Sequence, residues 1–269
     1  MLLREFADIF DINKGDRLYI ASELMKLAVL CRKAHEKFDM DELIDIIKEK
    51  VGEEGTILIP TFTFVFSNEK HYDYLHSPST VGALGNAALA RDDFKRTKHP
   101  MHSFAVWGAD KDLLCGMDNK HSFGNDSPFE YCRANHVKQI ILGTDYKHGM
   151  TFCHYAETAC NVPYRFAKTF TGEYTDENGI TETRTYDYAA RKLEIEPVEK
   201  INRIGAVFEE KGLSRSLDFR GCVSVQIDDL GAVWDTLCDD IMNNECRNIY
   251  DFNIPREQIF EGWKPVKPF

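Results

Sequence analysis

The sequence predicts an α/β fold, with a central mixed β-sheet flanked by helices and a β-hairpin elaboration in the second half. The first half alternates short β-rich runs with helical patterns, which is typical of this class. In the second half, residues 165–174 and 180–188 alternate in polarity around an Asn-Gly pair that favours a hairpin turn. We find no repeat and no long linker, and therefore expect a single compact domain over residues 1–269. Its core should span about 15–165, and a hairpin and helical part about 166–269.

The strand pattern begins with residues 17–21, which follow a Lys-Gly-Asp turn, and continues with the apolar, β-branched run 56–64. Further short apolar runs bounded by turn residues predict additional strands. These runs are 102–107, 138–142 and 222–227.

The clearest helix spans residues 39–51. Asp39 is a favourable N-cap, Asp41 and Glu42 suit the first turn, and Gly52 suits the end. A Ser-Pro pair at 127–128 opens a second helix. Similar patterns predict helices at 1–10, 82–91, 151–160, 197–211 and 230–242.

Composition and charge narrow the function classes. The eight cysteines form no CxxC pair, which favours free thiols and a cytoplasmic location. The formal net charge of −11 disfavours nucleic acid as a partner, whereas an acidic surface attracts cationic substrates. The sequence contains no run of about 18 apolar residues, so we expect no membrane-spanning helix. We expect the protein to bind small molecules, and the sequence is compatible with a homo-oligomer.

Reactive side chains are densest between residues 96 and 157. A predicted strand ends at Gly143, and the helix that follows carries His154 and Glu157. Residues three apart share a helix face, so Glu157 can orient His154 or stabilise its protonated form. Ligands of open α/β sheets bind beyond the carboxyl ends of the strands, which places this pair at the expected site. An imidazole with a pKa near ~6.5 suits proton transfer at neutral pH.

Several segments, taken in order, resemble the aminoglycoside 3-N-acetyltransferase family. They cover roughly residues 15–165, and the second half matches only in its pattern of elements. The matching segments are Lys14-Gly15-Asp16, residues 55–64, Ser79-Thr80-Val81-Gly82-Ala83-Leu84, Arg96-Thr97-Lys98-His99-Pro100 with Ser103-Phe104, residues 124–128, and Thr151 with His154-Tyr155-Ala156-Glu157.

The resemblance implies a non-GNAT acyltransferase that uses acetyl-CoA as co-substrate and acylates an amine of an amino sugar. It implies that His154 and Glu157 are catalytic, with His154 as general base. Thr80, before a predicted helix start, is our candidate oxyanion donor. The remaining candidates are Ser22, Thr80, Gly82, Arg96, Thr97 and Ser103 for CoA, and Asp126 and Glu23 for the acceptor.

The sequence departs from the family pattern after its first strand. The family often shows His-x-Ser-Leu there, and this chain has Ala21-Ser22-Glu23-Leu24. The acceptor is therefore either an aminoglycoside-type amine or a nucleotide-linked amino sugar of surface polysaccharide synthesis. A CoA- or sugar-binding protein with a decayed site is the non-enzymatic alternative.

Two other chemistries compete with direct transfer. His148, Cys153, His154 and Cys160 lie close in sequence, but their spacing fits no familiar zinc pattern, and we expect no metal. Cys153 or Cys160 could instead form an acyl-enzyme. Cys153 and His154 are adjacent, so on a helix they point about 100° apart, which disfavours a Cys-His pair.

Overall fold

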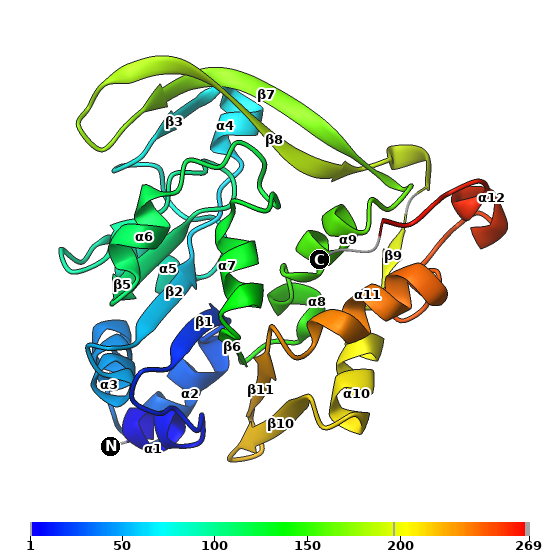
Figure 1. The fold of residues 1–269 in the computed structure, drawn as a ribbon. Helices are drawn as coiled ribbons and strands as arrows, with labels where there is room; N and C mark the ends of the chain where they lie inside the picture. Colours follow the sequence, from blue (N-terminus) through cyan, green and yellow to red (C-terminus); the bar gives the residue numbers. More distant parts are fainter. Residues whose placement is uncertain (1, 196, 267–269) are drawn as a thin grey trace.

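The computed structural model describes residues 2–195 and 197–266 and contains a central mixed sheet, as the sequence predicts (Figure 1). The sheet has seven strands, and the short β4 and the strand β10 were not predicted. β1 lies in the centre, parallel to both β2 and β6, and the outer strands run antiparallel to their neighbours. In spatial order the strands are β10 (Ser214–Phe219), β11 (Val223–Asp229), β6 (Lys138–Leu142), β1 (Arg17–Ser22), β2 (Thr56–Pro60), β5 (Phe104–Gly108) and β4 (Lys95–Arg96).

Successive side chains of β1 enter two different cores, because a strand alternates between the faces of its sheet. Leu18 and Ile20 belong to one buried cluster, and Tyr19 and Ala21 belong to the other. The first cluster is covered by α1 (Leu2–Asp8), α2 (Met25–Lys33), α3 (Met40–Val51) and α5 (Ala83–Leu89). The Asp39 carboxylate caps α3 by accepting from the backbone N–H groups of Asp41 and Glu42, as predicted.

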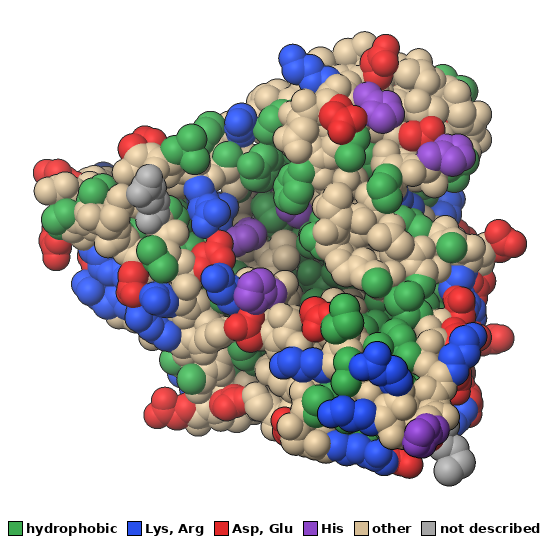
Figure 2. Space-filling model, turned by 180° about the vertical axis from the view of Figure 1, so that it is seen from behind, with side chains coloured by type: hydrophobic (Ala, Val, Ile, Leu, Met, Phe, Trp, Pro, Cys, Tyr) green, Lys and Arg blue, Asp and Glu red, His purple; other side chains and the backbone are tan. Residues whose placement is uncertain are grey.

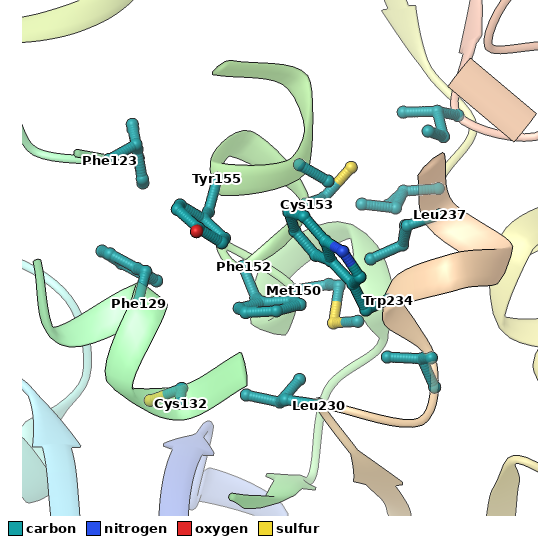
Figure 3. Close-up of a cluster of buried hydrophobic side chains, with 14 of the residues drawn as sticks. Phe123, Phe129, Cys132, Met150, Phe152, Cys153, Tyr155, Leu230, Trp234 and Leu237 are labelled. Carbon is teal, nitrogen blue, oxygen red and sulfur yellow. The ribbon is translucent and has the colours of Figure 1, made fainter. Parts of the chain in front are cut away.

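The second cluster carries the helices that surround the reactive region. They are α6 (Lys111–Gly116), α7 (Pro128–Ala134), α8 (Tyr146–Gly149), α9 (Cys153–Ala159), α10 (Asn202–Glu210), α11 (Trp234–Asn243) and α12 (Arg256–Phe260). Figure 3 shows Phe152 and Tyr155 facing Trp234 between α9 and α11. The rings of Tyr155 and Trp234 stack with centroids 5.0 Å apart. This contact fixes α9 against the core.

The hairpin of the second half is longer than the sequence pattern suggested. β7 (Arg165–Thr175) and β8 (Thr181–Arg191) pair along their whole length, and β3 (His71–Asp73) joins β7 in parallel. The hairpin extends past α4 (Val65–Glu69) and reaches toward the α12 side of the molecule (Figure 1). The open end of the hairpin, where β7 begins and β8 ends, therefore contributes residues near α9.

Three predicted boundaries are wrong. The helix expected at 230–242 begins only at Trp234. The helix expected at 197–211 begins only at Asn202, because β9 (Val198–Glu199) pairs with β12 (Tyr250–Asp251) beyond a short 3₁₀ turn (Leu193–Ile195). The strand expected at 56–64 ends at Pro60, and Phe64 already precedes α4. Within the described residues, none of the helices has the length and apolar character needed to cross a bilayer.

Candidate active site

A groove of about 670 Å³ lies at the carboxyl ends of the central strands, where the sequence argument placed the ligand. Its walls include Ser22 at the end of β1, Phe62 after β2 and Thr144 after β6. Apolar side chains from α2 and from the segment before α3 extend it outward, among them Met25 and Phe38. A long apolar groove of this kind suits a slender ligand.

A smaller chamber of about 300 Å³ adjoins the groove, since Phe62, Val81 and Thr151 line both. The other chamber walls are Phe64, His102, Phe123, His154, Arg165, Tyr188, Ala189, Arg191 and Glu199. Figure 2 shows a hollow in the centre of one face, with hydrophobic and histidine side chains in its walls. A ligand lying in the groove could therefore present one end to the chamber.

His154 and Glu157 lie on one face of α9, as predicted. His154 Nδ1 is 2.7 Å from Glu157 Oε2, and the Glu157 side chain is fully buried. An ionised carboxylate only accepts hydrogen bonds, so Nδ1 carries the ring hydrogen. The lone pair of the neutral ring is then on Nε2, which has no hydrogen-bond partner among the described residues. The pair has the geometry of a general base with its orienting carboxylate.

Glu157 is held by two further residues that the sequence argument missed, Tyr164 and Arg165. Tyr164 donates to Oε1 at 2.7 Å, and Arg165 Nε lies 2.7 Å from Oε2 as an ion pair, although its N–H does not point along that contact. Arg165 also donates to the Tyr250 hydroxyl and to the backbone oxygen of Ala189. Burial opposes ionisation of Glu157, but the charge of Arg165 and the contact with His154 outweigh it and lower its pKa to about 2. Glu157 is therefore a carboxylate at neutral pH.

The same arginine affects His154. Burial and the positive charge of Arg165, whose Nη2 is 3.0 Å from Nδ1, lower the pKa of His154 below its usual value, and Glu157 offsets part of this. The ring is therefore neutral at pH 7 and able to accept a proton. One signal in the sequence could have found this arginine, since Arg165 follows Glu157 by only eight positions, directly after a proline-containing turn.

Ser22, Glu23 and Gly82, three of the predicted ligand contacts, line the groove. Gly82 has φ +73°, and a Cβ there would stand 3.1 Å from the backbone oxygen of Ser22, so the walls approach closely at this point. Thr80 directly precedes Val81 and Gly82, which line the groove. Its hydroxyl donates to the backbone oxygen of Phe62 and does not cap α5. Asp126 is exposed and is not among the residues lining the groove or the chamber.

Arg96, Thr97 and Ser103, which we predicted to contact CoA, are all buried. The Arg96 guanidinium donates to Ser103 Oγ and to backbone oxygens, including that of Thr61 at 2.9 Å. Thr97 Oγ1 accepts from the backbone N–H of Phe104. These residues tie the β4–β5 edge to the loop after β2.

The competing chemistries find little support in the geometry. The Cys153 thiol is buried, and burial raises its pKa well above the usual range, whereas a nucleophilic cysteine needs a lowered pKa. Cys160 is buried as well. His148 pairs with Asp145 on α8, away from these thiols. No cluster of three or more potential metal ligands occurs within residues 2–195 and 197–266.

The fold is that of the aminoglycoside acetyltransferases. The aminoglycoside acetyltransferase AAC(3)-Xa superimposes with a TM-score of 0.74 at 19% identity, covering 89% of this chain and 91% of that one. AAC-IIIb, solved as a binary complex with CoASH, gives 0.74 at 16% identity over 90% and 95% of the two chains. AAC-VIa with bound sisomicin gives 0.74 at 18% identity over 90% and 97%.

The sequence comparison agrees with this class. The family model described as aminoglycoside 3-N-acetyltransferase matches residues 20–233, and the chain belongs to that family. A curated relative, the SPbeta prophage-derived aminoglycoside N(3')-acetyltransferase-like protein YokD of Bacillus subtilis (strain 168), is 28% identical over 151 residues. That alignment covers 46% of this chain and 53% of the relative, so it spans about half the length of YokD.

Proposed function

We propose that this protein transfers an acetyl group from acetyl-CoA to an amine of an amino sugar, with His154 as general base. The observation that carries the proposal is the position of His154, which contacts Glu157 through Nδ1 and lines a chamber that adjoins the groove. The groove is long and largely apolar, which fits the pantetheine arm of CoA. CoA and sisomicin, which bind to the structural neighbours, indicate the two ligand classes.

The chain's own residues supply positioning and proton transfer. The acceptor nitrogen bonds to the thioester carbon while its proton moves to His154 Nε2, and Glu157 stabilises the imidazolium. The C–S bond breaks, and the departing thiolate can regain this proton. A positioned base contributes about 10²–10⁴-fold to the rate. Thr80 is our candidate for stabilising the oxyanion, for which its hydroxyl hydrogen must turn from the Phe62 backbone oxygen toward the thioester.

The charges in the chamber favour a second candidate acceptor, a nucleotide-linked amino sugar. Both carboxylates near the chamber are already paired, Glu157 with Arg165 and Glu199 with Arg191 at 2.9 Å. A polycationic aminoglycoside gains most from unpaired carboxylates, whereas an acceptor with one amine does not need them. Arg191 is partly exposed and could meet a phosphate of such a substrate.

The test is a release assay for free CoA thiol, with acetyl-CoA and either sisomicin or UDP-glucosamine as acceptor. We expect turnover with at least one of the two, and the preferred acceptor decides between the two candidates. His154→Ala should lower turnover by about 10²–10⁴-fold while CoA affinity stays within about twofold. Wild-type protein that binds CoA but acetylates neither acceptor would indicate a binding protein with a decayed site.

A further inference from the structure

A second imidazole faces the chamber. His102 is 5% exposed and belongs to the chamber walls. On its far side, Nδ1 lies 2.8 Å from Ser122 Oγ. The same oxygen is 3.3 Å from His99 Nε2 and 3.3 Å from the backbone oxygen of Asp187. A buried network thus holds the ring of His102 from behind.

One set of hydrogen positions gives every contact in this network a hydrogen. His99 Nδ1 accepts from the backbone N–H groups of Met101 and His102, so the ring hydrogen of His99 is on Nε2 and can be donated to Ser122 Oγ. The single hydroxyl hydrogen of Ser122 has two acceptors within reach, His102 Nδ1 at 2.8 Å and the Asp187 oxygen at 3.3 Å, which also accepts from the Ser122 backbone N–H. We assign it to the Asp187 oxygen, so that an N–H at His102 Nδ1 supplies the remaining contact. In this arrangement every contact has one hydrogen, and His102 Nε2 keeps its lone pair.

No hydrogen bond links His102 Nε2 to any residue within 2–195 and 197–266. Its ring is surrounded by aromatic rings, with centroids 5.0 Å away at Phe62 and 4.9 Å at Phe123. Phe123 also contacts His154, at 5.9 Å, so the two imidazoles border the same space. Burial lowers the pKa of His102 far below its usual value, which keeps the ring neutral.

We propose that His102 Nε2 accepts one N–H bond of the attacking amine and thereby orients it. This inference rests on the proposed function. A neutral primary amine has two N–H bonds and one lone pair. If His154 Nε2 accepts one N–H bond and His102 Nε2 the other, the lone pair is left to point at the thioester carbon. A secondary amine has a single N–H bond and cannot satisfy both rings, so the chamber selects primary amines.

The first test reads the hydrogen position of His102 directly and needs no substrate. The protein has nine histidines, and ¹⁵N-histidine NMR spectra of the full chain, compared with those of His102→Gln, assign the His102 signals. We expect Nδ1 to be protonated and Nε2 to be unprotonated at pH 7. A proton on Nε2 would overturn the inference while leaving the role of His154 intact.

The second test compares two variants. His102→Phe keeps a ring in the aromatic cluster but has no acceptor, whereas His102→Gln places an amide oxygen near the lost Nε2. Acetyl-CoA is supplied with glucosamine or its N-methyl derivative, and CoA release is followed. In His102→Phe we expect kcat/KM for glucosamine to fall about 10–100-fold and the preference for the primary amine to disappear. His102→Gln should recover part of both.

CoA affinity serves as the folding control and should stay within about twofold in both variants. If His102→Phe binds CoA normally and keeps both its glucosamine kcat/KM within threefold and its preference for the primary amine, then His102 does not orient the acceptor. Failure of His154 as the base would appear separately, as undiminished turnover in His154→Ala. The two ideas can therefore fail independently.

Discussion

Glu157→Gln tests the central electrostatic argument, because it removes one charge and leaves the shape almost unchanged. In the wild type, the imidazolium that forms at His154 lies against this carboxylate and close to the positive charge of Arg165. Two unit charges about 4 Å apart interact by about 4 kcal/mol at an effective dielectric of about 20. Glu157 is fully buried and His154 is 28% exposed, so solvent screens the pair only in part.

The proton is only partly transferred in the transition state. We therefore expect Glu157→Gln to remove about 3–4 kcal/mol of the stabilisation that the carboxylate gives to the forming imidazolium. That loss corresponds to a fall of about 10²–10³-fold in kcat/KM. The side-chain amide of this variant could turn its NH₂ group toward His154 Nδ1. Nδ1 would then have to accept a hydrogen bond, the ring hydrogen would move to Nε2, and the loss of activity would be larger. If its oxygen faces Nδ1 instead, the tautomer is kept and the charge effect remains.

The assay is kcat/KM against pH, followed by CoA release with the acceptor identified in the screen. Glu157 raises the pKa of His154, so its removal should shift the acid limb to lower pH while activity at pH 7.5 falls. An NMR titration of His154 gives the same pKa without any acceptor. Glu130→Gln is the matched control, since it removes a paired, half-buried glutamate on α7 that lies outside the chamber. Activity of Glu157→Gln within threefold of wild type, or an acid limb that moves upward, would refute the reasoning.

Arg165→Met should move the acid limb of the kcat/KM profile to higher pH, because the guanidinium lowers the pKa of His154 and activity needs the unprotonated ring. An acid limb that stays in place would contradict this electrostatic role of Arg165. Gly143→Ala should lower the free energy of unfolding by about 2–4 kcal/mol in a denaturant titration, since Gly143 has φ +71° and a new Cβ would stand 2.0 Å from the backbone oxygen of Glu23. Gly179→Ala is its control, with φ +77° and no atom within 4 Å of the new Cβ, and should cost only about 1–2 kcal/mol of backbone strain. Equal losses in the two glycine variants would show that close packing at Gly143 is unimportant.

Local signals in the sequence predicted most of the elements. The Asp39 cap, the Asn178-Gly179 turn and the Ser127-Pro128 start are local signals, and each marks a real boundary, although the Ser127 hydroxyl makes no capping hydrogen bond. The boundaries that failed lie where distant segments meet. The missed β9 exists only because Tyr250 and Asp251 pair with it across about fifty residues.

The candidate site divides in the same way. The spacing of His154 and Glu157 on one helix was visible in the sequence, because i and i+3 share a face whatever the helix packs against. The burial of Arg96 was not visible, since a charged residue in a turn is usually solvated, and here it satisfies backbone oxygens of the loops beside β4. The position of Asp126 outside the chamber also depends on how the loop before α7 folds back.

The sequence by itself determined the α/β class, the hairpin and the pairing of His154 with Glu157, since periodicity, turn chemistry and helical spacing are local properties. Only the tertiary structure decided which charges reach that pair. Arg165 comes from the start of the hairpin, Arg191 from its end, and Glu199 from β9. Their effects depend on distance through a low-dielectric interior, and such distances between remote segments are fixed only when the chain has packed.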